Sequence, residues 1–168
     1  MLQFSFAQSE DLPRIVSIYN QTVPTRLATA DLKPVSVESR RTWFASHTQE
    51  SRPLWVMKMK DEVVIGWISL GDFYGRPAYS HTAEISLYID EQYRGQRLGQ
   101  LALAFVEKHL QRLEVNTLLA FVFGHNMASQ NLFKKNGFEI WGHLPKVALM
   151  DDQLRDLDIL GKRYQNGI

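Results

Sequence analysis

The sequence contains no cysteine among its 168 residues. Without thiols the chain can form neither disulfide bonds nor thiolate metal sites, and it has no cysteine that could carry an acyl group. It also has no apolar run long enough to cross a membrane, and its first twelve residues lack the basic flank and apolar stretch of a signal peptide. We therefore expect a cytoplasmic protein with no membrane partner.

The sequence also lacks a long run of basic residues. The formal net charge is +1, and lysine and arginine occur at most in pairs such as Arg40–Arg41 and Lys134–Lys135. Because non-specific nucleic-acid binding depends on neutralising many phosphates, we expect no nucleic-acid partner. The five histidines show no His-x-x-x-His spacing. The sequence therefore predicts no metal site.

The length and the 45% hydrophobic content fit one domain that spans residues 1–168. Apolar runs and period-two alternation predict strands at residues 3–6, 54–59, 63–70, 81–89, 117–123, 139–141, 148–150 and 157–160. Helical spacing predicts helices at residues 10–20, 37–47, 98–113 and 127–136. We expect an Asp61–Glu62 turn between the second and third strands. This order predicts an α/β (α+β) domain whose mixed, mostly antiparallel sheet is flanked by helices.

Several local signals refine this scheme. Ser9 is placed to cap the first helix, and Asn126 is placed to cap the last one, with Gly137 as its stop. Trp43 and Phe44 are expected to be buried in the second helix. The segment from His81 to Phe123 reads strand, loop, helix, strand, which supplies one parallel crossover.

The run Gln92–Gly99 joins the strand at 81–89 to the helix at 98–113. The free N–H groups of a helix start and the helix dipole favour an anion there, and Arg94 and Arg97 add positive charge. Gly95 and Gly99 leave the backbone open to close approach. The loop matches neither the P-loop nor the dinucleotide fingerprint. It therefore predicts a site for a phosphorylated cofactor of another kind, although a basic turn before a helix can also occur without a ligand.

A second signal follows the next strand. Residues 124–138 read GHNMASQNLFKKNGF, a helix opened by Asn126 and closed by Gly137 and Phe138. Together with the loop from Arg94 to Gly99, this segment resembles the GCN5-related N-acetyltransferases (GNAT), which hold the pyrophosphate of acetyl-CoA in such a loop.

More of the chain, about residues 4–160, resembles the phosphinothricin acetyltransferase branch of that superfamily. The segments that carry this likeness are IYN at 18–20, RTWF at 41–44, GDF at 71–73, HTAE at 81–84, LYI at 87–89 and GHLP at 142–145. The resemblance implies a homodimeric, acetyl-CoA-dependent N-acetyltransferase (an acyltransferase) that acts on the amine of a small amino-acid-like substrate, such as phosphinothricin or methionine sulfoximine. Two alternatives stay open: a protein or peptide N-terminal acetyltransferase and a non-catalytic acyl-CoA sensor.

The resemblance implies that the amine attacks the thioester directly, which agrees with the absence of cysteine. Glu84 matches the strand glutamate of the family and is our candidate base, acting directly or through water, because a half-buried carboxylate should have a raised pKa. The alternative is that Glu84 only orients the substrate. The position where many relatives carry an acidic tyrosine is Phe133, which cannot donate a proton.

The resemblance also implies which residues bind the two substrates. The backbone of one strand segment is expected to contact pantetheine, and the loop is expected to contact pyrophosphate; these residues are Leu87, Tyr88, Ile89, Arg94, Gly95, Gln96, Arg97, Leu98 and Gly99. Asn126 is an additional pantetheine candidate, or only a helix cap, and Lys135 is a candidate for the 3′-phosphate, or only a solvated lysine.

For the acceptor, the loop at 71–80 offers aromatic surface and a cation, namely Phe73, Tyr74, Arg76 and Tyr79. Core or dimer packing is the alternative role for Phe73. Better-known phosphinothricin enzymes carry a tryptophan where this chain has Ala28–Leu32, and an arginine where it has Ser80. Both differences concern the acceptor side, so they leave acetyl transfer in place and put phosphinothricin itself in question.

Overall fold

The computed structural model describes residues 1–60 and 62–165. The predicted turn at Asp61–Glu62 therefore lies partly outside the described residues, since Asp61 is not among them. The helices and strands, in chain order, are β1 (Gln3–Phe6), α1 (Leu12–Thr22), α2 (Arg41–Ala45), β2 (Leu54–Lys58), β3 (Val64–Asp72), β4 (Thr82–Ile89), α3 (Leu98–Glu107), β5 (Thr117–Phe123), α4 (Met127–Lys135), β6 (Glu139–Met150) and β7 (Gln153–Arg163).

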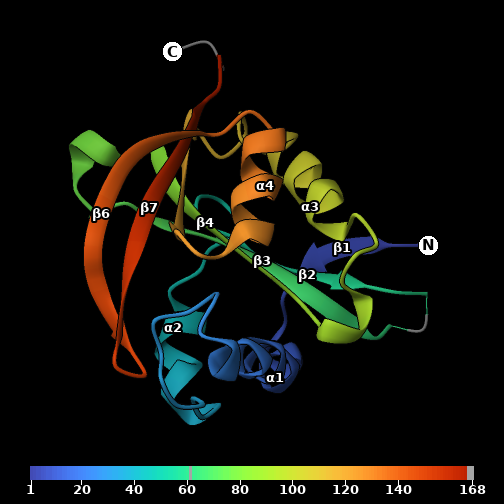
Figure 1. Ribbon diagram of the computed structural model, residues 1–168. Helices are drawn as coiled ribbons and strands as arrows, with labels where there is room; N and C mark the ends of the chain where they lie inside the picture. Colours follow the sequence, from blue (N-terminus) through green and yellow to red (C-terminus); the bar gives the residue numbers. More distant parts are fainter. Residues whose placement is uncertain (61, 166–168) are drawn as a thin grey trace.

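Within the described residues the strands form one seven-stranded sheet in the order β1-β2-β3-β4-β5-β7-β6. Every neighbouring pair is antiparallel except β4 and β5, which run parallel. Helices α3 and α4 cover one face of the sheet, and α1 and α2 cover the other (Figure 1). The predicted mixed, mostly antiparallel sheet with flanking helices is confirmed, including the single parallel crossover.

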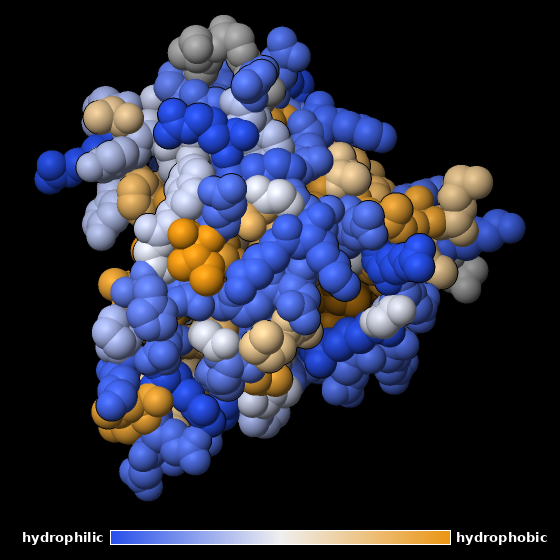
Figure 2. All heavy atoms as spheres, turned by 45° about the horizontal axis from the view of Figure 1, so that its top comes forward, coloured by the Kyte–Doolittle hydropathy of each residue, from blue (hydrophilic) through white to orange (hydrophobic). Residues whose placement is uncertain are grey.

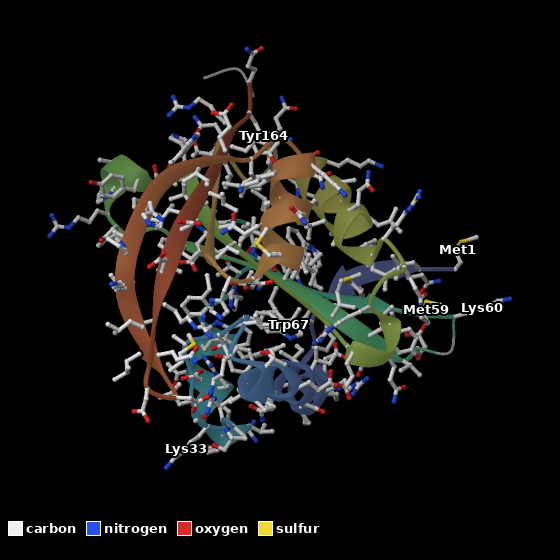
Figure 3. All side chains as sticks on the ribbon, in the orientation of Figure 1. Met1, Lys33, Met59, Lys60, Trp67 and Tyr164 are labelled. Carbon is white, nitrogen blue, oxygen red and sulfur yellow. The ribbon has the colours of Figure 1, made fainter. Side chains whose placement is uncertain are left out.

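The alternation of β4 places its side chains on two different surfaces. Ala83 and Ile85 are buried in the larger core cluster, which lies under α3 and α4. A smaller cluster on the α1 face contains Ile15, Ile18 and Trp67. Trp67, labelled in Figure 3, lies between the sheet and α1, where its indole N–H donates to the carbonyl oxygen of Ile15 at 3.1 Å. The sheet therefore has an apolar layer on each side, and β4 contributes to both.

Two helix predictions need correction. Ser9 lies inside a 3-10 turn and is not the cap; instead the carboxylate of Asp11 accepts the N–H of Gln8 at 2.8 Å, and α1 starts next to Pro13, which suits a first helical turn. The predicted helix at 37–47 is only a 3-10 turn followed by the five residues of α2. Trp43 and Phe44 are half-buried, because such a short helix covers little of the sheet.

The three late strand predictions are also wrong in extent, because residues 139–163 form two long strands, β6 and β7. Proline argues against a continuous strand in the interior of a sheet, but β6 is the edge strand. Pro145 lies within an irregularity of register between Leu144 and Ala148, where a missing N–H costs no ladder bond. The edge position therefore allows the strand to continue through a residue that the sequence pattern treats as a break.

Candidate active site

The central feature of the site is the separation of β4 from β5. The two strands pair only at Thr82–Thr117, Ala83–Leu118 and Glu84–Leu119. Beyond that point β4 continues along β3 and β5 continues along β7, so the two strands diverge. The backbone of residues 85–89 consequently has an edge that no described strand occupies. The opening between the two strands forms a cleft. The residues that line it include Glu84, Ser86, Leu87, Tyr88, Phe123, Asn126, Ser129 and Phe133.

Glu84 lies at the apex of this cleft. Its carboxyl group is half-buried, and the structure records no hydrogen bond for it with the described part of the chain. Burial raises the pKa of Glu84 above its ordinary value, because desolvation penalises the charged form. The predicted raised pKa is confirmed, and a carboxylate of this kind is suited to accept a proton near neutral pH.

The predicted phosphate loop follows the end of β4. Gly95 has a φ of 78° and Arg97 a φ of 59°, so the backbone turns through the left-handed region twice before α3 begins. The first N–H groups of α3, at Leu98, Gly99 and Gln100, have no partner within the helix by its geometry. Arg94, Gln96 and Arg97 are exposed beside them. The loop therefore presents donors and positive charge at the open side of the cleft, which fits an anion.

A buried carboxylate that the sequence analysis did not select anchors this loop. Asp90 accepts hydrogen bonds from Arg14 at 2.6 Å, from Gln21 at 2.9 Å and from the N–H of Gln92 at 2.8 Å. Burial alone would raise the pKa of Asp90, but these hydrogen bonds outweigh it and hold the pKa below its ordinary value. The one sequence signal for this anchor is an acidic residue at a strand end, two residues before a glutamine whose N–H it can accept.

Gly99 also has a packing role, besides the cofactor contact expected for it. Gly99 is buried, and a Cβ atom at this position would lie 2.8 Å from Cδ2 of Leu132 in α4. The missing side chain therefore allows α3 and α4 to pack closely. Gly95, by contrast, has open space where a Cβ atom would lie, but it has the positive φ that favours glycine.

Asn126 is the N-cap of α4, as predicted: its side-chain oxygen accepts the N–H of Ser129 at 3.2 Å. Its side-chain nitrogen donates to the carbonyl of Leu27 and to Ser129 Oγ, both at 3.1 Å. His125 Nε2 lies 2.7 Å from the carbonyl of Arg26, and the Tyr88 hydroxyl donates to the carbonyl of Ala28 at 3.1 Å. Residues 26–28, here called the strap, are thus held by groups from both sides of the cleft.

The rest of α4 contributes one residue to the cleft wall. Phe133 is buried, faces the cleft and packs against Phe138 with ring centroids 5.0 Å apart. Lys135 is exposed near the end of the helix, one turn beyond the Leu132 that contacts Gly99, and the described residues record no ion pair for it. Both positions are compatible with the roles expected for them, and neither role is tested by the structure.

The loop between β3 and β4 lies apart from this cleft. Phe73, Tyr74 and Tyr79 form an aromatic group with ring centroids 4.7 to 6.3 Å apart, and Tyr74 is 80% exposed. Phe73, Arg76 and Tyr79 line a separate surface hollow that does not include Glu84. Arg52 holds the loop through an ion pair with Asp72 at 2.7 Å. The structure therefore groups the predicted acceptor residues together but does not bring their side chains into the cleft.

A cavity that the sequence analysis missed lies on the α1 and α2 face of the sheet. Its lining includes Tyr19, Arg40, Trp43, Trp67, Ser69, Ser86 and Tyr88. Ser86 and Tyr88 also line the cleft of Glu84, so the two spaces share a wall. The only signal in the sequence is the period of two in β4, which places Ser86 on the same face as Glu84.

Two kinds of feature are absent from residues 1–60 and 62–165. No helix there is long and apolar enough to span a membrane. No cluster of three or more histidine, cysteine, aspartate or glutamate side chains there could hold a metal ion.

The sheet therefore opens beside a helix N-terminus, with the half-buried carboxyl group of Glu84 at the apex of the cleft. The profile of the "Acetyltransferase (GNAT) family" matches residues 13–138, and the chain belongs to this family. It is therefore an acetyltransferase, as the sequence resemblance implied.

Individual relatives agree with this assignment. The chain is 47% identical over 156 residues to the Bacillus subtilis protein named "Putative phosphinothricin acetyltransferase YwnH", covering 93% of this chain and 95% of that protein. It is 33% identical over 152 residues to the L-methionine sulfoximine/L-methionine sulfone acetyltransferase of Pseudomonas aeruginosa, covering 89% and 87%. A crystal structure of a protein described as a "putative phosphinothricin N-acetyltransferase" superposes with a TM-score of 0.93 at 45% identity, covering 97% of this chain and 98% of that chain.

Proposed function

We propose that this enzyme transfers the acetyl group of acetyl-CoA to the amine of a small amino-acid-like molecule, with phosphinothricin and methionine sulfoximine as specific candidates. One observation carries the proposal: Glu84 lies where the opened sheet, which fits the pantetheine arm, meets a face that an acceptor can reach. The names of the two curated relatives support the choice of acceptor, and they do not favour the peptide acetyltransferase or the sensor.

The chemistry assigned to Glu84 is proton removal. An amine attacks the thioester carbonyl only after it has lost its proton, and an α-amino group has a pKa of roughly 8. The raised pKa of Glu84 brings its carboxylate closer to the basicity that this transfer needs. Glu84 takes the proton from the attacking amine, directly or through water, while the carbon–sulfur bond breaks and CoA leaves as a thiolate. Because Phe133 replaces the acidic tyrosine, the thiolate takes its proton from solvent or another group.

We assign acetyl-CoA to the cleft between β4 and β5. Pantetheine amides would pair with the backbone of Leu87, Tyr88 and Ile89, whose edge has no partner strand in the described structure, much as a peptide adds to a sheet edge. The pyrophosphate would accept from the N–H groups of residues 94–99, with Asn126 and Lys135 as further candidates. The resemblance names the loop residues Phe73, Tyr74, Arg76 and Tyr79 as acceptor candidates, but three of them line a hollow that does not include Glu84.

We further propose a homodimer in the cytoplasm. The support for a dimer is the hairpin of β6 and β7 at the edge of the sheet. It exposes several large apolar side chains, namely Ile140, Trp141, Leu144, Val147 and Leu149 from β6 and Leu154 from β7. By comparison, the face in Figure 2 is mostly hydrophilic, with apolar residues in small scattered groups. The cysteine-free composition supports a reducing compartment.

The test of the function is a thiol-release assay with acetyl-CoA and a panel of free amino acids that includes phosphinothricin and methionine sulfoximine. Turnover that depends on one class of amine, with acetylated product identified by mass spectrometry, is the expected result. Tight binding of acetyl-CoA without turnover of any amine in the panel would contradict the proposal and leave the sensor or a macromolecular acceptor.

A further inference from the structure

The cavity on the α1 and α2 face has a polar floor between aromatic walls. Ser69 of β3 and Ser86 of β4 face each other directly across the two strands and form this floor. The next pair along, Trp67 and Tyr88, stacks with ring centroids 4.6 Å apart. Trp43 adds a second indole at 5.4 Å from that of Trp67. Such a space suits a short aliphatic chain that carries polar groups.

The strand register places this floor next to the candidate base. Glu84 pairs with Gly71, and the following pair on the same face of the sheet is Ser69 with Ser86. Residues two apart in a strand are separated by about 7 Å. A molecule that lies over the serine pair therefore has one end beside Glu84 and the other end toward Trp67 and Tyr88.

The cavity also contains polar groups without a protein partner. Ser69 is only 5% exposed, and the described structure records no hydrogen bond for its hydroxyl or for that of Ser86. Ser86 is half-buried, and both hydroxyls face the cavity, so they are available to bond a polar ligand or water there.

Among the described residues that line the cavity, Arg40 alone is charged. One of its terminal nitrogens donates to Asp31 at 3.1 Å, and its guanidinium lies 4.8 Å from the ring centre of Tyr19 and 5.8 Å from that of Trp43. A guanidinium carries five N–H donors, and the described residues record an acceptor for one. The ion pair with Asp31 holds the side chain in place, and its other N–H donors stay available to an acceptor oxygen.

We propose that this cavity binds the side chain of the acceptor and that Arg40 determines which acceptors are used. The aliphatic stem would lie between Trp43 and Trp67 over the serine floor, and the end of the side chain would accept hydrogen bonds from Arg40. The substrate class is therefore a primary amine on a short stem that ends in a carboxylate, phosphinate or sulfonyl oxygen. This inference rests on the proposed function and places the specificity of the acceptor in the cavity, not in the loop at 71–80.

The experiment compares two acceptors that share a two-methylene stem, phosphinothricin and norvaline. Beyond the stem, phosphinothricin carries an anionic methylphosphinate group, and norvaline carries only a methyl group. Arg40→Gln should raise the Kd and KM for phosphinothricin by roughly 10- to 100-fold, the range for a lost hydrogen bond to a charged group. The Kd and KM for norvaline and for acetyl-CoA should change less than about 3-fold in the same variant. Arg41→Gln is the matched control, since Arg41 is 61% exposed and, among the described residues, pairs with Glu38 on the surface.

Binding is measured by tryptophan fluorescence in the presence of CoA, because Trp43 and Trp67 line the cavity, and KM by thiol release. Equal losses for both acceptors in Arg40→Gln, or no loss, would overturn the inference. A selective loss in Arg76→Gln instead would also overturn it and assign the acceptor to the loop. Absence of turnover by the unmodified enzyme would count against the proposed function alone, because the fluorescence titration still decides whether the cavity binds the acceptor.

A second variant covers the case in which Arg40→Gln is too unstable to use. Ser69→Val fills the floor of the cavity without altering a charge. It should weaken the binding of both phosphinothricin and norvaline and leave the binding of acetyl-CoA unchanged. Unaltered binding of both acceptors would overturn the inference.

Discussion

Glu84 and Leu119 form the last pair of the parallel ladder between β4 and β5. The next residues of the two strands separate, so the carboxyl group of Glu84 lies where backbone pairing ends and the cleft begins. The surrounding protein excludes part of the solvent from the carboxyl group of Glu84, and this burial raises its pKa. One change in strand pairing thus creates the space for a substrate and modifies the group that is proposed to act on it.

The first prediction concerns catalysis by Glu84. Replacement by glutamine keeps the shape but removes the base, so kcat should fall by about 10²- to 10⁴-fold. In the unmodified enzyme kcat/KM should rise with pH through the raised pKa of Glu84, because the carboxylate is the active form. The variant should lack this acidic limb in thiol-release assays across pH. A variant with an unchanged profile would show that Glu84 only orients the substrate.

The second prediction uses the same variant for stability. Because the pKa of Glu84 is raised in the folded protein, its protonated form favours folding at pH values below its unfolded pKa, and this contribution is lost as pH rises through the folded pKa. Glu84→Gln should therefore unfold at a higher temperature than the unmodified protein at pH 7, and the difference should shrink toward pH 4. Thermal melts followed by circular dichroism measure this. Equal melting temperatures at neutral pH would show that burial of this charge costs no stability.

The third prediction separates the two roles of Asn126. Asn126→Asp keeps a side-chain oxygen to cap α4, but it cannot donate to the carbonyl of Leu27 in the strap. Asn126→Ala loses both roles, and cap loss costs about 1 kcal/mol. We expect hydrogen exchange of residues 26–28 to quicken in both variants, whereas α4 loses protection only in Asn126→Ala. If the strap exchanges at the native rate in Asn126→Asp, His125 and Tyr88 hold it without Asn126.

The fourth prediction tests why residue 99 is glycine. In Gly99→Ala the new Cβ would press on Leu132, so the free energy of unfolding should fall by about 1–2 kcal/mol although alanine is the better helix former. Leu132→Ala in the same chain should recover part of this loss in a double-mutant cycle. Gly95→Ala is the control: its cost comes from a positive φ, and the Leu132 change should not relieve it. Additive losses for residues 99 and 132 in chemical denaturation would argue against close packing as the reason.

The fifth prediction addresses the dimer. Val147→Lys combined with Leu149→Lys adds two charges to one side of the exposed β6 edge and should yield a monomer by light scattering after size-exclusion chromatography. Leu101→Lys is the matched control, since Leu101 is similarly exposed on α3, away from the hairpin. A dimer that persists in the β6 variant would place the interface elsewhere.

The strands in the middle of the chain could be predicted closely from the sequence. The strand at 117–123 agrees with β5 at both ends, because a fully buried strand is a short apolar run between turns. Predictions failed where tertiary position overrides local preference. Proline interrupts a central strand but not an edge strand, and the sequence does not show that β6 is the edge.

For the candidate site, the loop and Glu84 could be selected from the sequence because their signals are local: glycines before a helix, and a polar residue in an alternating strand. The residues around the cavity could not, because Arg40, Ser69 and Ser86 come from three separate segments. Each of them alone resembles an ordinary surface arginine or a serine in a strand. Only the pairing of β3 with β4 and the packing of α1 and α2 bring them together.

The sequence by itself determined the order of the elements as far as α4, the position of the glycine-containing loop before α3, and the family, since these depend on periodicity, glycine placement and short spacings along the chain. The tertiary structure decided that β4 and β5 separate after Glu84, that Gly99 accommodates Leu132, and that Arg40 faces a cavity beside Ser86. These features depend on contacts between residues far apart in the chain, and each contact is fixed by packing and strand register, which no local pattern encodes.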